Sequence, residues 1–88
     1  MMTERLVVDF APMEGAVLRM LGLVERRGFR VSGIGMTERP CGKQASLELD
    51  VVARDAGRRI EVLGLQLRRL HGVSDVTHAP PCVRERAA

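Results

Sequence analysis

The stretch from Glu14 to Met36 constrains the fold more than any other part of the chain. Its first half, EGAVLRMLGLVERR, has apolar residues at helical spacing, and a core-facing stripe is expected at Val17, Met20, Leu21 and Val24. Two arginines and Gly28 then follow, which is typical of a helix C-terminus because glycine accepts a left-handed conformation. A strand is expected to begin at Phe29. The helix therefore needs an apolar sheet to cover.

The remaining strands show period-2 alternation. Leu6, Val8 and Phe10 predict a first strand that Pro12 closes. After a hairpin at residues 38–43, a third strand is expected to direct one set of apolar residues to a single side, namely Ala45, Leu47, Leu49 and Val51. This sheet should be covered on one side only.

A second helix is expected to begin with Asp55 as its N-cap. Its apolar stripe should consist of Ala56, Ile60, Leu63, Leu67 and Leu70. His71 and Gly72 should end the helix, and residues 73–77 should form a fourth strand before Pro80 and Pro81.

The predicted order is β-α-β-β-α-β, which indicates an α+β, ferredoxin-like two-layer sandwich. Its four-stranded antiparallel sheet would carry both helices on one face. One domain is expected over residues 4–79, with a disordered tail at residues 80–88. A chain of 88 residues suffices for one such core but not for a substrate pocket within a single copy.

The composition favours a cytoplasmic protein without a membrane partner. Hydrophobic residues make up 45% of the chain and charged residues 28%, which is ordinary for a globular domain. No apolar run approaches the roughly 20 residues that span a bilayer. The N-terminus, MMTERLVV, contains an acidic residue and does not resemble a signal peptide.

Few residues are arranged for catalysis or metal binding. Cys41, Cys82, His71 and His78 match no standard metal spacing, and a disulfide is not expected in a reducing compartment. No nucleophile motif is present, and the segment 33–35, GIG, lacks the third glycine of a dinucleotide fingerprint. We expect that segment to mark a bend or a close packing contact, and we expect no catalytic residue, metal site or cofactor in this chain.

Nucleic acid is the binding partner that the topology first suggests, because RNA-recognition modules share it. Those modules stack bases on aromatic residues of the central strands. Here the third strand has no aromatic residue, and its Glu48 and Asp50 would repel phosphate. The phase of Phe10 and Phe29 places both with the core, and the net charge of +3 is modest. A nucleic-acid partner is therefore not expected, and the polar sheet face stays a candidate protein-binding surface.

The turn between the first strand and the first helix is the first candidate site. Free N–H groups at a helix start, here near Gly15 and Ala16, favour a carboxylate or phosphate. Gly22 within the helix should cost about 1 kcal/mol relative to alanine. Either another element approaches the helix closely at Gly22, or the glycine is simply tolerated.

The order of elements and the string ERRGFRVSGIGM resemble the ACT domain, and specifically the small regulatory subunit of acetolactate synthase. In that family a glycine turn leads into a helix that ends in Arg-Arg-Gly or Arg-Arg-Ala, followed by an aromatic residue and a strand. The matching residues here are Gly15, Arg26, Arg27, Gly28, Phe29 and Val31. The third strand and the segment LQLRRLHGVSDV resemble later parts of the pattern, so the resemblance covers residues 6–78.

The resemblance implies a non-catalytic subunit that activates the acetolactate synthase catalytic subunit in branched-chain amino-acid biosynthesis. Thiamine diphosphate, Mg and FAD would belong to that catalytic partner. Many members bind valine or a related effector where two ACT domains meet, so a homodimer is expected. The ligand or dimer region should comprise Met13, Glu14, Gly15, Ala16, Phe29, Arg30, Val31 and Ser32.

Two departures from the family pattern argue against valine feedback. Feedback-sensitive members carry Asn-x-Pro-Gly at the turn, where this chain has Pro12-Met13-Glu14-Gly15. They also carry Asn after the aromatic residue, where this chain has Arg30. Both amides are lost, and Glu14 would repel a carboxylate. The second domain of larger members is also absent, so the chain resembles the short form. A free-standing ACT module that senses an amino acid for another enzyme is the alternative.

Overall fold

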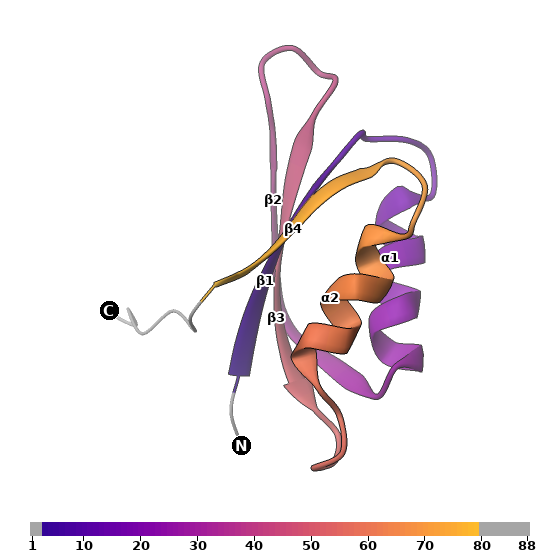
Figure 1. Cartoon of the computed structure of the whole chain (residues 1–88). Helices are drawn as coiled ribbons and strands as arrows, with labels where there is room; N and C mark the ends of the chain where they lie inside the picture. The colour runs from indigo at the N-terminus through magenta and orange to yellow at the C-terminus, as the bar shows by residue number, and fades with distance from the viewer. Residues whose placement is uncertain (1–2, 80–88) are drawn as a thin grey trace, which may run out of the picture.

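A computed structural model describes residues 3–79, and it contains the six predicted elements in the predicted order. The ferredoxin-like βαββαβ arrangement is therefore confirmed (Figure 1). The tail expected at residues 80–88, which includes Cys82, lies outside the described residues. The elements are β1 (Thr3–Phe10), α1 (Ala16–Arg26), β2 (Phe29–Glu38), β3 (Ala45–Ala53), α2 (Ile60–Arg68) and β4 (Val73–Ala79).

The four strands form one antiparallel sheet in the order β2-β3-β1-β4. Both helices lie on the same face of this sheet, and the β2–β3 hairpin extends past them (Figure 1). Because β1 and β3 are the inner strands, β2 and β4 form the two edges. Within residues 3–79, the outer side of β2 therefore has no strand beside it.

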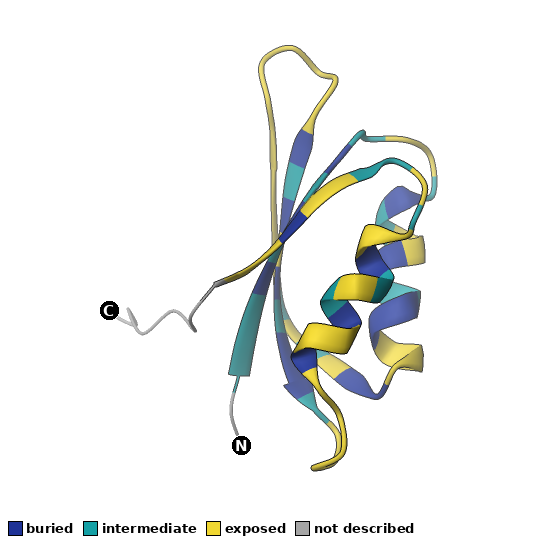
Figure 2. Ribbon diagram, in the orientation of Figure 1, coloured by how far each residue is buried: buried dark blue, intermediate teal, exposed yellow. Residues whose placement is uncertain are grey.

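The core lies between the sheet and the helices, as the alternation in the strands predicts (Figure 2). Leu47, Leu49 and Val51 of β3 are fully buried against the helices. The buried residues of the helices are Ala16, Met20, Leu23 and Val24 in α1 and Ile60, Leu63 and Leu67 in α2. Figure 2 shows the other sides of both helices as exposed ribbon.

The contact face of α1 differs from the predicted stripe. Leu23 is buried, whereas Val17 and Leu21 are only half-buried and pack at the margin of the core. Leu21 instead faces a hollow beside β2, because α1 rests on the sheet mainly through Met20 and Val24. The helical spacing was correct, but the centre of the stripe was misplaced.

The start of α2 was predicted too early. Asp55 does not cap the helix, because its Oδ1 accepts a hydrogen bond from the N–H of Gly57 at 3.0 Å and so closes a local turn. The helix begins at Ile60, with Arg59 at the N-cap position. Ala56 is therefore in the β3–α2 connection and is exposed, contrary to the prediction. Glycine at position 57 favours this turn over an earlier helix start.

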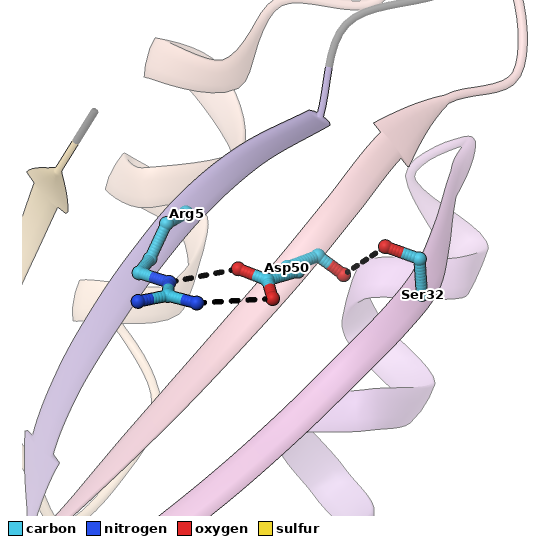
Figure 3. A network of polar contacts seen from close by, with 3 residues as sticks. All are labelled: Arg5, Ser32 and Asp50. Atoms are coloured by element: carbon cyan, nitrogen blue, oxygen red, sulfur yellow. Dashed lines mark hydrogen bonds and ion pairs between the residues drawn. The ribbon is translucent and has the colours of Figure 1, made fainter. Parts of the chain in front are cut away.

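A polar contact ties three strands together on the uncovered face of the sheet (Figure 3). Arg5 donates to both carboxylate oxygens of Asp50, at 2.8 and 3.2 Å, and this bond raises the pKa of Arg5. Ser32 donates to the backbone oxygen of Asp50 at 3.2 Å. The register shifts between Val31 and Gly33, and a Cβ at Gly33 would lie 2.9 Å from the Asp50 carboxylate. The bend and close contact predicted for the GIG segment are thus confirmed.

Candidate functional site: the β1–α1 turn and the α1–β2 face

The β1–α1 turn has the conformation that a glycine at position 15 permits. Gly15 adopts a φ of 82°, which residues with a Cβ rarely tolerate. The N–H of Ala16 donates to the oxygen of Met13 at 3.0 Å, so the turn itself uses that group. The N–H groups of Val17 and Leu18 have no backbone acceptor among the described residues. They are the donors that an anion at this helix start would meet.

A single chain does not enclose a ligand at this turn. The hollow beside it, lined by Ala16, Arg19 and His71 among others, has a volume of only about 10 Å³. That is room for about one water molecule. Met13 and Glu14 are both exposed at the rim of the turn. An amino acid at this place would need further walls.

The other predicted segment, Phe29–Ser32, lies at the opposite end of α1 (Figure 1). The helix has 11 residues and is therefore about 16 Å long, so the two segments do not meet within one chain. Phe29 is buried in the core, and Val31 is half-buried on the helix side of the sheet. Arg30 is exposed and pairs with Val52 of β3. The residues predicted as one site thus form two separate groups.

Between these two groups lies an exposed apolar surface, the α1–β2 face. Leu18 of α1 is 75% exposed, and Ile34 and Met36 of β2 are 55% and 46% exposed. A shallow hollow of about 400 Å³ separates the helix from the strand and is lined by Leu18, Leu21, Gly22, Glu25, Val31 and Ile34. Large contiguous apolar patches on a folded chain mark interaction sites.

The glycine at position 22 helps to keep this face open. Among residues 3–79, a Cβ there would meet only the tip of the Arg26 side chain, at 3.6 Å, so no other described element approaches it. No described element packs closely on Gly22, so two explanations remain: a glycine that is simply tolerated, or a close approach by something outside residues 3–79.

Sequence reasoning missed the exposed members of the α1–β2 face. Leu18 falls outside the predicted core stripe, and this departure was a usable signal. Ile34 and Met36 share the side of β2 that faces the helices, since they pair with the buried Leu49 and Leu47. Nothing in their local pattern indicates exposure, because it results from the position of β2 at the edge, beyond the cover of α1.

The site offers no constellation for metal chemistry. Among residues 3–79, no group of three His, Cys, Asp or Glu side chains is placed to hold a metal ion. Within the same part of the chain, no helix is long and apolar enough to cross a membrane.

Several solved structures share this fold. The ACT domain from GTP pyrophosphokinase of Chlorobium tepidum superposes with a TM-score of 0.70 at 13% identity, covering 88% of this chain and 96% of that one. The acetolactate synthase small subunit of Thermotoga maritima has a TM-score of 0.74 at 23% identity, covering 89% of this chain and 47% of that one. A formyltetrahydrofolate deformylase from Pseudomonas putida has a TM-score of 0.72 at 12% identity, with 91% and 29% covered.

These identities are low, so the superpositions establish the fold alone. No curated protein matches the sequence. The fold, the glycine turn and the open edge define a small regulatory or ligand-binding module. Residues 12–76 match the ACT domain family, and the chain belongs to that family. ACT domains regulate partner enzymes and bind small ligands, and a single ACT domain is typically regulatory rather than catalytic.

Proposed function

We propose that this protein is a non-catalytic regulatory small subunit that binds and activates the acetolactate synthase catalytic subunit in the cytoplasm. The choice of enzyme rests on the sequence pattern around the α1–β2 turn. Gly28 there has a φ of 89°, and Phe29 behind it is buried in the core. Gly28 is thus suited to the turn, and Phe29 fixes the start of β2 in the core; both belong to the pattern that resembles the family. Thiamine diphosphate, Mg and FAD would be held by the catalytic partner.

The observation that best supports a regulatory assembly is the exposed α1–β2 face beside the unpaired edge of β2. Two copies related by a two-fold axis could pair their β2 edges and bury Leu18, Ile34 and Met36 against each other. Burying this surface would remove both an unpaired edge and an exposed apolar patch from water. We therefore propose a homodimer through this face.

Such a dimer would also complete the ligand region. When β2 pairs antiparallel with β2 of the second copy, the two α1 helices run in opposite directions. The Met13–Ala16 turn of one copy then lies toward the Phe29–Ser32 segment of the other. The two groups that are about 16 Å apart in one chain would come together across the interface. The free N–H groups of Val17 and Leu18 would then face an effector from one side.

Valine is not the effector that this region favours. Pro12 and Arg30 stand where feedback-sensitive members of the family carry amides, and the neighbouring Glu14 is exposed and charged. The carboxylate of Glu14 would repel that of valine at short range. We expect activation of the enzyme without inhibition by valine.

The test is acetolactate formation by the catalytic subunit from the same source, with and without this chain and with and without valine. A clear rate increase and co-purification would support the proposal, and an unchanged rate in valine would support the absence of feedback. No increase and no co-purification would exclude this enzyme as the partner.

A free-standing ACT module that senses an amino acid for another enzyme is the second candidate. The loss of both amides favours it, because nothing else ties the ligand region to valine. If the acetolactate assay fails, a binding screen over the standard amino acids by calorimetry would test this candidate. Binding of any one of them near the turn would establish it.

A further inference from the structure

The end of the molecule where α1 finishes and α2 starts is rich in arginine. Backbone contacts hold the segments together there, since the N–H of Arg54 donates to the oxygen of Gly28 at 2.8 Å. The arginines at this end are Arg26, Arg27, Arg30, Arg54, Arg58 and Arg59. The nearby acids are Glu4, Glu25, Asp55 and Glu61. The end thus has a net charge of +2, whereas the other described residues have six basic and six acidic side chains and no net charge.

Within this end lies a hollow of about 170 Å³ between the two helices, which we name the arginine-rimmed hollow. Its floor is apolar, formed by the buried Phe29 and Leu63 and by Val62, which is 48% exposed. Its rim consists of Arg27, Arg58 and Arg59, with Gly57 between them. An apolar floor inside a ring of positive charge selects for a particular kind of occupant.

The rim side chains are positioned but not neutralised. Arg27 donates to the amide oxygen of Gln66 at 3.3 Å, which directs it across to α2 without removing its charge. Arg58 is 3.4 Å from Asp55, and its side chain lies against Gly28, where any Cβ would collide with it. Arg59 is 3.9 Å from Glu61. Both of these acids are largely exposed, so the pairs are weak and the arginines can exchange partners.

We propose that the arginine-rimmed hollow docks an acidic segment of a partner protein in which one apolar side chain is flanked by Asp or Glu. The apolar side chain would enter the floor beside Val62. The flanking carboxylates would meet the guanidinium groups of Arg27 and Arg59, whose planar donors match a carboxylate in two parallel bonds. Charge complementarity at the rim and burial at the floor together specify this occupant.

The same features disfavour RNA as the occupant. Single-stranded nucleic acid binds basic grooves by stacking its bases on exposed aromatic rings. The only ring at this hollow is Phe29, which is 3% exposed and covered by the core. The floor therefore suits an aliphatic side chain better than a base.

This docking site lies outside the α1–β2 face and goes beyond the proposed function, because it does not depend on which enzyme is regulated. Its test uses the full chain and a fluorescein-labelled short peptide with one leucine between pairs of glutamates, followed by anisotropy at about 0.15 M ionic strength. A second peptide with serine in place of the leucine tests the floor. Failure of the acetolactate assay would leave this measurement unaffected.

Matched variants test the rim and the floor separately. Arg27→Gln with Arg59→Gln should weaken peptide binding about fivefold, through the loss of two exposed ion pairs. Arg39→Gln with Lys43→Gln removes the same charge from the β2–β3 hairpin and should leave binding unchanged. Val62→Ser should weaken binding, whereas Leu65→Ser, three residues away on the same helix but outside the hollow, should not.

Equal losses in both double variants would mean that only net charge matters, and would overturn the proposal. Equal affinity for the leucine and serine peptides would also overturn it, because the floor would then have no role. An oligoribonucleotide that displaces the leucine peptide at lower concentration would reassign the surface to nucleic acid. Thermal midpoints of all variants close to that of the unmodified chain would exclude misfolding as the cause of any loss.

Discussion

Truncating Leu18 to alanine should separate the proposed homodimer into folded single chains. The side chain is 75% exposed in one chain, so only about a quarter of its surface is buried there and contributes to the stability of that chain. The same side chain would lie in the middle of the α1–β2 face in the dimer. The substitution therefore discriminates between assembly and folding.

The size of the effect follows from the exposed area. Leucine to alanine removes the equivalent of about three methylene groups, or about 2.4 kcal/mol when fully buried. About three-quarters of that, or about 1.8 kcal/mol per copy, would be lost on association, and two-fold symmetry doubles it to about 3.6 kcal/mol. The dimer dissociation constant should rise about 400-fold.

Sedimentation equilibrium over a range of protein concentrations would measure this change. Leu65→Ala is the matched control, because Leu65 is a leucine on α2 that is 60% exposed and lies away from the α1–β2 face. It should leave the dimer constant unchanged. A dimer that survives Leu18→Ala but weakens with Leu65→Ala would place the interface on α2 and refute the reasoning. A Leu18→Ala chain that loses several kcal/mol of folding stability would show that Leu18 belongs to the core.

Three further predictions concern the fold. Leu67→Ala should lower the free energy of unfolding by about 2–5 kcal/mol in urea titration, since Leu67 is fully buried, whereas an equal effect from Leu65→Ala would contradict the burial pattern. Gly28→Ala should cost more than Gly42→Ala in the same assay. Both glycines have a positive φ, which costs a residue with a Cβ about 1–2 kcal/mol. Only at Gly28 would the added Cβ also collide with a neighbour, the side chain of Arg58. Gly33→Ala should displace the Asp50 carboxylate and break its hydrogen bond to Arg5. The NMR resonance of the Arg5 Nε–H would report this loss. An unchanged resonance would show that Asp50 moves without losing its partner.

Much of the fold could be predicted because it depends on local patterns. The alternation in β3 placed Leu47, Leu49 and Val51 in the core, and these residues are fully buried. The end of α1 was also predictable, because Gly28 supplies a left-handed conformation there, whereas α2 ends at Arg68 with Arg69 as its C-cap, before the predicted His71-Gly72. The start of α2 was not predictable in the same way. Asp55 is suited both to a helix N-cap and to a local turn, and in the structure its Oδ1 accepts the N–H of Gly57 in a turn.

The candidate site was predicted less completely than the fold. The turn at Gly15 and the strand start at Phe29 were found from their resemblance to a family pattern, yet they lie at opposite ends of α1. The distance between them depends on the length of the helix, and their joint role depends on a second copy. The exposure of Ile34 was not predictable, since a side chain on the inner side of an edge strand has the same local pattern as one in the core, whereas Leu18 fell outside the predicted stripe of α1 and could have been noticed.

The sequence by itself determined the order of elements, the residues that can face a core, and the turns that require glycine. These properties depend on spacing along the chain and on backbone conformations within a few residues. Only the tertiary structure decided that β2 lies at an edge, that α1 leaves Ile34 and Met36 uncovered, and that arginines from three segments gather at one end. The physical reason is that strand order and helix placement result from pairing between residues far apart in sequence. Surfaces that can bind partners therefore lie where that pairing stops, at the edge strand β2 and at the ends of the helices.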